Sequence, residues 1–380
     1  MSCVPAATFV AEVLVGAPAP RRRPARTQSS PRTTILVPAH NEQAVIEGTL
    51  ANLRGELDAN TDLLVVADNC EDDTPERAER AGARVVRRVD PTRRGKGYAI
   101  EFGLEELAKK PPEIVVIVDA DCRVEPGSIG TLARRAQATG RPVQAEYLIL
   151  PPRLEPKTAV NALAFLIKNR VRPLGLARLG LPCQLTGSGM AFPWDVIRQA
   201  PPMGAYLVED MLMGIELARL GKAPLFCPDA RIRSELPTRE QAQQGQRRRW
   251  EHGHLATLIE QGPRLVLEGL LRGNLDLLAL GLDVLVPPLT LFLLGLCAVL
   301  GLNFLASVGL GLGPGPLALS LGAVVAVGAS VLVAWLTQGR ELVPLRYALR
   351  VPGYVLWKLP VYVAFAARRK QSTWEQTERS

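Results

Sequence analysis

The sequence predicts an α/β fold with a doubly wound, mostly parallel sheet, followed by a membrane-associated region. Strand-like apolar segments alternate with helical segments in the first part of the chain, which is the βαβ rhythm of such sheets. Beyond about residue 272 the composition changes, and residues from about 275 to 339 are almost uncharged, with Asp276 and Asp283 as the exceptions. At 380 residues the chain has room for two or three domains.

The predicted elements of the α/β part follow one another in a regular order. Strands are expected at residues 34–38, 63–67, 84–89, 114–118 and 144–150, and helices at 42–53, 74–81 and 98–109. The strand at 114–118 is a β-branched apolar run, which is typical of a central parallel strand that is buried on both faces. Ahead of the first strand, residues 4–20 are mildly apolar but short and carry Glu12, so we expect a degenerate or truncated membrane anchor there.

Apolar stretches close the chain. Residues 277–310 are long enough to span a bilayer despite two prolines and an aspartate, and residues 317–336 form a cleaner second span. Residues 351–367 are interrupted by prolines and a lysine, and a third span there would put the basic residues 368–370 on the outer side. A re-entrant or tilted segment is therefore favoured, with a third span as the alternative.

The charge and the cysteines exclude some classes of protein. The formal net charge is +8, and the basic clusters at residues 21–23, 247–249 and 368–370 lie beside apolar segments. This placement indicates the cytoplasmic side of a membrane and its anionic headgroups, and no nucleic-acid-binding motif is present. The six cysteines include no C-x-x-C pair, which predicts free thiols in a reducing compartment and no zinc site.

Polar residues follow four of the predicted strands. The four segments are Val37-Pro38-Ala39-His40-Asn41-Glu42, then Asp68 to Asp73, then Arg93-Arg94-Gly95-Lys96-Gly97, and last Asp119-Ala120-Asp121. In a parallel sheet all of these segments project to one edge, where ligands bind. Two carboxylates spaced i, i+2 can hold a divalent cation that in turn holds a diphosphate, although such pairs also occur in ordinary turns and helix caps.

Further motifs lie downstream. Residues 187–192 read as a turn leading into a strand, and Glu209-Asp210 open a predicted helix, where acidic residues are often caps. Gln246-Arg247-Arg248-Arg249-Trp250 stand just before the membrane region. A juxtamembrane basic patch with an interfacial Trp explains the arginines of this segment but not Gln246.

Taken in order, these motifs resemble glycosyltransferase family 2. The likeness is greatest to its membrane-bound branch, with the cellulose, chitin, hyaluronan and poly-N-acetylglucosamine synthases, and it covers about residues 33 to 255 plus the terminal spans. The resemblance implies a GT-A catalytic domain with a Rossmann-like sheet, a nucleotide-diphosphate sugar donor that is most often a UDP-sugar, and Mg²⁺ or Mn²⁺ as cofactor.

The resemblance also implies a role for each matched residue. Asp210 is expected to be the general base with Glu209 beside it, and Asp121 is expected to coordinate the metal ion. The remaining strand-end residues are expected to bind the donor nucleotide: Pro38 and Glu42 shape its pocket, Asp68 contacts the base, Asp119 lies near the ribose or uridine part, and Lys96 approaches the phosphates. Gln246, Arg249 and Trp250 are expected to close over the pyrophosphate and the acceptor.

The chain is therefore expected to divide into consecutive regions. These are an N-terminal tail with the eroded anchor and a linker (1–31), the GT-A domain (32–255), a juxtamembrane or interfacial segment (256–274), the membrane region (275–370) and a tail (371–380). Two departures from the branch, the eroded N-terminal helix and the small number of clear spans, argue against polymer translocation.

The expected function is inverting, metal-dependent hexosyl or N-acetylhexosaminyl transfer at the cytoplasmic face of a bacterial inner membrane. The acceptor is a growing cell-surface glycan or polysaccharide, and the expected partners are the lipid bilayer and other polysaccharide-export proteins, with no nucleic acid. One alternative is transfer of a single sugar to a lipid acceptor, such as polyprenyl phosphate or a glycolipid. Another is an inactive membrane scaffold that binds nucleotide sugars.

Overall fold

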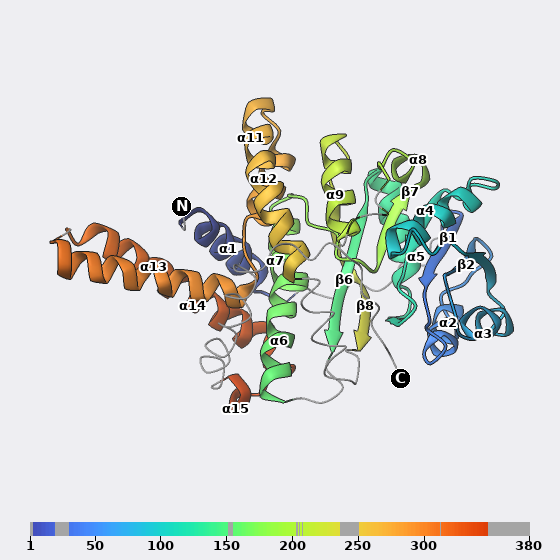
Figure 1. Cartoon of the computed structure of the whole chain (residues 1–380), viewed down its shortest axis with the longest axis horizontal. Coiled ribbons are helices and arrows are strands. Elements are labelled where there is room, and N and C mark those ends of the chain that lie inside the picture. The colour runs from blue at the N-terminus through green and yellow to red at the C-terminus, as the bar shows by residue number, and fades with distance from the viewer. Residues whose placement is uncertain are drawn as a thin grey trace. The chain divides into compact units, whose positions relative to one another are not determined.

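The chain is described by a computed structural model for residues 3–19, 30–150, 155–202, 204, 206, 208–235, 251–311 and 313–348. It divides into two compact units (Figure 1). The sheet unit comprises residues 21–150, 182–253 and 373–380, and the helical unit comprises residues 1–20, 151–181 and 254–372. Residues 151–181, which lie within the expected domain at 32–255, pack with the helical unit.

The sheet unit is built on an eight-stranded sheet with the order β3-β2-β1-β4-β7-β6-β8-β5. The strands are β1 (Thr33–Ala39), β2 (Thr61–Asp68), β3 (Arg84–Arg88), β4 (Ile114–Ile117), β5 (Cys122–Val124), β6 (Val143–Leu150), β7 (Met190–Pro193) and β8 (Leu225–Glu235). The neighbours β3-β2-β1-β4 are parallel, and so are β6 and β8, whereas β7 and β5 run antiparallel to their partners. The mostly parallel sheet predicted from the sequence is confirmed.

Helices pack on the sheet through alternating strand residues. The helices of this unit are α2 (Ile46–Arg54), α3 (Thr74–Arg80), α4 (Lys96–Leu107), α5 (Ser128–Thr139), α8 (Trp194–Ile197) and α9 (Glu209–Arg219). Leu36, Val66 and Ile117 belong to a buried cluster that also takes in residues of α4, α8 and α9. Neighbouring strand residues such as Val65 and Val116 are equally buried and point to the opposite face. The central strands are thus covered on both sides, as expected for parallel strands.

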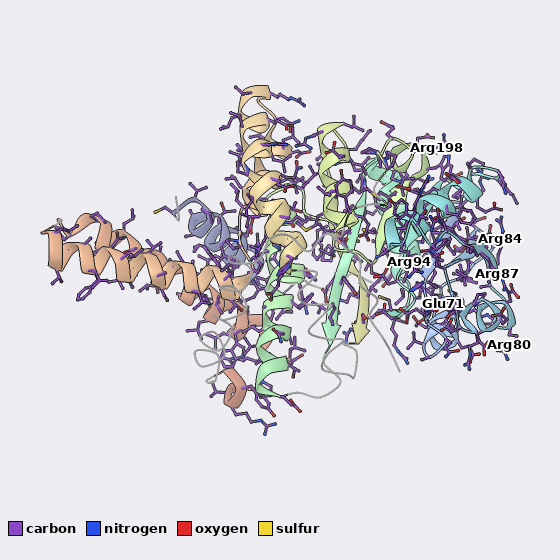
Figure 2. The ribbon with its side chains drawn as sticks, viewed as in Figure 1. Glu71, Arg80, Arg84, Arg87, Arg94 and Arg198 are labelled. Atoms are coloured by element: carbon purple, nitrogen blue, oxygen red, sulfur yellow. The ribbon has the colours of Figure 1, made fainter. Side chains whose placement is uncertain are left out.

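The edge strand β3 is covered with charge. Figure 2 labels Arg84 and Arg87 at the outer rim of this unit, where Arg84 pairs with a carboxylate on α4. Arg87 forms ion pairs of 2.9 and 3.0 Å with Glu76 and Glu79 of α3. Charged side chains on an edge strand prevent further strand pairing, so the sheet ends at β3.

The helical unit gathers helices from distant parts of the sequence. They are α1 (Cys3–Gly16), α6 (Pro156–Leu166), the π-helix η1 (Ile167–Val171), α7 (Arg172–Arg178), α11 (Gly262–Arg272), α12 (Leu275–Val284), α13 (Leu289–Leu310), α14 (Gly315–Ala334), the π-helix η2 (Trp335–Gly339) and α15 (Leu345–Ala348). Residues 251–260 are also helical. All six cysteines are free, as predicted.

The N-terminal helix α1 is tightly packed. A Cβ atom on Gly16 would stand 1.9 Å from the Val171 carbonyl oxygen, and one on Gly175 would stand 2.0 Å from the Glu12 carbonyl oxygen, so only glycine allows this crossing. Arg172 Nε donates a 2.6 Å hydrogen bond to Glu12 Oε2, and its Nη2 pairs with Asp283 of α12. The expected eroded anchor is thus an ordered helix, because Glu12 has a buried partner.

The expected span at 277–310 is divided. Helix α12 ends before Pro287 and Pro288, and α13 begins directly after them, since these prolines cannot continue the hydrogen bonding of α12. Among the described residues, α13 with 22 residues and the stretch Gly315–Gly339 with 25 are long and apolar enough to cross a bilayer. They lie side by side in Figure 1. The segment at 351–367 lies outside the described residues.

Candidate active site

The carboxyl ends of β1, β2 and β4 lie at one edge of the sheet, because these strands are parallel neighbours. Pro38 lies in β1, Asp68 is the last residue of β2, and Asp119 and Asp121 follow β4. Strand β7 runs antiparallel to β4, so the turn before it, at residues 187–189, returns to the same edge. The strand-end motifs recognised in the sequence are therefore neighbours in space.

Asp119 and Asp121 are close enough to share a cation. One carboxylate oxygen from each of them and the Cys122 sulfur all lie within 4.8 Å of one another. The Ser234 hydroxyl on β8 donates a 3.0 Å hydrogen bond to Asp121 Oδ2. Carboxylate oxygens suit Mg²⁺ and Mn²⁺, so this pair fits the expected ion. Burial raises the pKa of the Cys122 thiol well above its ordinary value, and a protonated thiol is a poor ligand for such hard ions.

Lys96 stands at the start of α4 and reaches into the acidic centre. Its Nζ forms an ion pair with Asp119 Oδ1, donates a 2.5 Å hydrogen bond to the Gly187 carbonyl, and lies 3.9 Å from Glu209 Oε1. Burial alone would lower the pKa of Lys96, but Asp119 and Glu209 outweigh burial and raise the pKa above its ordinary value. Burial also raises the pKa of Asp119, and Lys96 opposes that rise. Lys96 is therefore charged and compensates for crowded carboxylates.

Glu209 and Asp210 are the first two residues of α9. Burial raises the pKa of the Glu209 carboxyl from 4.5 to about 7, against the opposing effect of Lys96. A Cβ atom on Gly187 would stand 3.4 Å from Asp210 Oδ2 and 3.7 Å from Lys96 Nζ. The Gly187 backbone thus runs beside the expected base and the lysine, and both acidic residues of α9 face the same centre as Asp119.

The turn at residues 187–189 is held by polar contacts. The buried Gln144 side chain accepts from the Thr186 N–H at 2.9 Å and donates to the Ser188 carbonyl at 2.8 Å. The Asp119 N–H donates to Ser188 Oγ at 3.0 Å. Gly189 has a φ of +70°, and a Cβ there would stand 2.8 Å from the Ala145 Cβ. The Gly-Ser-Gly sequence, interpreted above as a simple turn, therefore fixes the backbone of Asp119.

Asp68 lies at the far side of the same edge. Arg88 Nη1 donates a 2.6 Å hydrogen bond to Asp68 Oδ1, and the guanidinium carbon lies 5.4 Å from the centre of the Tyr98 ring. Asn41 and Asn69, which follow β1 and β2, adopt positive φ angles of 55° and 50°. Non-glycine residues with such angles cluster at functional sites, where the surrounding structure maintains them.

Five predicted site residues remain, and the structure describes two of them. Pro38 is buried within β1, and the Glu42 N–H donates a 2.7 Å hydrogen bond to Thr74 Oγ1 at the start of α3. Gln246, Arg249 and Trp250 lie outside the described residues.

Sequence reasoning missed several residues that shape this edge. Ser188, Gln144, Ser234 and Arg88 each bond to a predicted site residue or to its turn. The glycines on both sides of Ser188 were the available signal for a special backbone conformation. For Gln144 and Ser234 no local signal exists, because both depend on the way β6 and β8 pair in the sheet.

Parts of the chain are similar to known proteins. A protein-family model described as "Glycosyltransferase like family 2" matches residues 31–253. Glucosyl-3-phosphoglycerate synthase of Mycobacterium tuberculosis is 38% identical over 94 residues, which are 23% of this chain and 28% of that protein. Glycosyltransferase AglD of Haloferax volcanii is 29% identical over 132 residues, 33% of this chain and 21% of that one. The chain thus spans less than a third of the length of either relative.

One solved structure matches over almost the full length. Mannosyltransferase PcManGT from Pyrobaculum calidifontis, in complex with GDP-Man and Mn²⁺, has a TM-score of 0.55 and 20% sequence identity. The match covers 94% of this chain and 98% of that chain. At this identity the likeness shows a shared fold.

Proposed function

Because the chain belongs to glycosyltransferase family 2, we propose that it transfers a hexosyl group from a nucleotide-diphosphate sugar to an acceptor at the cytoplasmic face of a membrane. One observation carries this proposal. Asp119 and Asp121, which fit a divalent cation, share an edge of the sheet with Lys96, Glu209 and Asp210. Ligands of open α/β sheets bind at this edge, beyond the carboxyl ends of the strands.

The residue types suit an inverting, single-displacement transfer. Asp210 at the start of α9 serves as the general base that accepts the proton of the acceptor hydroxyl as its oxygen attacks the anomeric carbon. Asp121 with Asp119 would hold Mg²⁺ or Mn²⁺, which would supply positive charge to neutralise the departing diphosphate. Lys96 binds the diphosphate, and Asp68 with Pro38 and Glu42 forms the nucleotide pocket. No covalent intermediate is needed, because one base suffices for one displacement.

The donor is expected to be a UDP-sugar or a GDP-sugar. The named relatives support hexoses, since one is a glucosyl-3-phosphoglycerate synthase and another is a mannosyltransferase solved with GDP-Man. A carboxylate such as that of Asp68 can accept from an N–H of uracil or guanine, and both bases offer one.

Membrane association is the second part of the proposal. In helix α13 and in the stretch Gly315–Gly339, only 11% and 22% of the most apolar window is covered by other residues. The core helix of a water-soluble protein would be mostly covered, so we expect both helices to cross the bilayer as a hairpin.

The exposed leucines of helix α11 also favour membrane association. Its Leu265 and Gly269 pack on α12, whereas Leu267, Leu270 and Leu271 are 57%, 63% and 78% exposed. At about 100° per residue these three leucines share one side of the helix. An exposed leucine face next to membrane-crossing helices suits the interface between headgroups and acyl chains.

Two acceptor classes follow from this arrangement. A growing cell-surface glycan or polysaccharide is the first candidate. A lipid acceptor that receives a single sugar is the second, and the exposed apolar helices α13 and α14 favour it, since they would hold the protein where such lipids reside. An inactive scaffold is disfavoured, because the carboxylates that the chemistry needs are all present at one edge.

The test is a donor screen with the full chain in membranes. UDP- and GDP-sugars are supplied with and without Mn²⁺, and release of nucleoside diphosphate is measured. One donor is expected to be consumed in a metal-dependent manner, and Asp121→Asn is expected to abolish its consumption. Long products on a gel would identify a polymer, and one sugar on extracted lipid would identify a lipid acceptor. Donor binding without turnover would overturn the proposal in favour of a scaffold.

A further inference from the structure

Lys96 is the positive charge within a group of acidic residues. Four carboxylates, those of Asp119, Asp121, Glu209 and Asp210, lie at one edge of the sheet. The Lys96 ammonium contacts Asp119 and lies 3.9 Å from Glu209. Its side chain is only 24% exposed, so water replaces these contacts poorly. Like charges at such distances repel strongly in a partly buried site unless a cation lies between them.

Lys96 and a divalent ion would compete for the same carboxylate, that of Asp119. Lys96 bonds to Asp119 Oδ1, and Asp119 with Asp121 forms the pair that fits the ion. The ammonium group is also fixed by the Gly187 carbonyl at 2.5 Å. A divalent ion that enters alone would therefore compete with Lys96 for Asp119 and be repelled by the positive charge of the lysine.

A diphosphate would remove this conflict. Lys96 is the first residue of α4, a helix of 12 residues, and helix N-termini attract anions through their free N–H groups. A donor whose phosphates reach Lys96 offers it a new partner, and movement of Lys96 toward the phosphates would let Asp119 bind the ion. The ion and the donor would then strengthen each other's binding by the same factor.

We propose that Lys96 is a positioning residue that holds the place of the divalent cation until the donor diphosphate arrives, so that the ion and the donor bind as a pair. This inference rests on the proposed function, because it assumes a diphosphate ligand. It goes further because it assigns a cause: without the donor the ion binds weakly, and Lys96 is the residue that lowers its affinity.

The test measures Mn²⁺ binding without turnover. The full chain in detergent is titrated with Mn²⁺, and the free ion is followed by its electron paramagnetic resonance signal, alone and with UDP or GDP. We expect the natural protein to bind Mn²⁺ at least tenfold more tightly when the preferred nucleotide is present. Lys96→Met is expected to bind Mn²⁺ at least tenfold more tightly than the natural protein when no nucleotide is present, and to gain little from the nucleotide.

Matched variants separate charge from packing. Lys96→Arg keeps the positive charge and is expected to keep Mn²⁺ binding weak without nucleotide. Lys109→Met removes an exposed lysine just beyond the same helix and is expected to change nothing. If Lys96→Met is poorly folded, Mn²⁺ should raise its melting temperature by more than it raises that of the natural protein, since the ion then replaces the missing cation.

The outcomes distinguish this inference from the proposed function. Equal Mn²⁺ affinity of Lys96→Met and the natural protein without nucleotide, while UDP or GDP still tightens binding, would overturn the counter-ion role and leave the proposed function intact. Failure of every nucleotide to affect Mn²⁺ binding in any variant would overturn both.

Discussion

Each unit contains an arginine or a lysine among carboxylates, and the two clusters differ in exposure and in charge balance. In the helical unit, Arg172 contacts Glu12 and Asp283, and each of the three residues is at most 4% exposed. In the sheet unit, Lys96 contacts Asp119, and both side chains remain about a quarter exposed. The first cluster is sealed, and the second is open to a ligand.

The two clusters also differ in the number of carboxylates for each cation. The sealed cluster holds one cation and two carboxylates that are directly bonded to it through a planar guanidinium. The open cluster surrounds one flexible ammonium with more carboxylates than it can bond. The comparison teaches that a sealed cluster whose cation bonds directly to each carboxylate indicates a structural role, whereas an exposed excess of one charge indicates a binding site for the opposite charge.

Breaking the sealed cluster should give the largest effect. Arg172→Met leaves two buried carboxylates without their partner, which costs about 3–5 kcal/mol of stability. Thermal unfolding in detergent measures the loss. Arg178→Met is the matched control on the same helix, because Arg178 is exposed and bonds only backbone carbonyls of residues 15 and 18, so we expect a loss of about 1 kcal/mol. Equal losses from the two variants would contradict the structural role of Arg172.

The turn that supports the open cluster is the next target. Gly189→Ala forces a left-handed φ on alanine and places its Cβ 2.6 Å from Ile232 Cδ1, so we expect a loss of about 2–4 kcal/mol and reduced Mn²⁺ affinity. Gly140→Ala has a φ of +60° but no atom within 4 Å of its Cβ, so it isolates the backbone cost of about 1 kcal/mol. Identical melting temperatures for both variants would refute the tight packing of the turn.

The pH dependence of stability sharpens the contrast. The pKa of Glu209 is raised from 4.5 to about 7 in the folded chain, so the folded state holds this proton more tightly than the unfolded state. Between about pH 4.5 and 7 the natural protein should therefore lose up to about 3 kcal/mol of stability relative to Glu209→Gln as the pH rises, and no more above pH 7. If the melting temperatures of the two proteins differ by the same amount at every pH in this range, the pKa of Glu209 is not raised.

Removing the base should affect the rate and leave stability unchanged. Asp210→Asn keeps the shape of the side chain but cannot accept the proton, so we expect turnover to fall about a hundredfold, equivalent to about 2.7 kcal/mol of barrier. Donor and Mn²⁺ binding should persist, as measured by titration. Asp195→Asn, on the exposed side of α8, is the control with normal turnover. Near-normal turnover of Asp210→Asn would exclude Asp210 as the base.

The sequence predicted the open cluster better than the sealed one, for a physical reason. Asp119, Asp121 and Lys96 follow strands whose order and direction a βαβ rhythm predicts, so their proximity follows from the topology. Glu12 and Asp283 stood in apolar segments as isolated charges, and Glu12 counted as evidence against an anchor. Their common partner Arg172 is separated from them by 160 and 111 residues, and no local pattern connects them.

The same limit explains the domain boundaries. The strands at 34–38, 63–67, 84–89, 114–118 and 144–150 were all found, with ends shifted by a few residues. Residues 151–181, expected within the catalytic domain, pack with the helical unit, and this packing depends on contacts with α1 that no local pattern reports. The periodicity of apolar residues predicts which face of an element is buried. It does not predict which distant element packs on that face.

The two units alternate along the sequence, and this alternation has a practical consequence for recombinant expression. A fragment of residues 31–253, the natural choice from the family match, would retain α7 while discarding both carboxylates that neutralise its arginine. Such a fragment should accumulate in inclusion bodies. Crystallographers who want the catalytic part would therefore do better to keep Glu12 and Asp283 in the expressed chain together with Arg172.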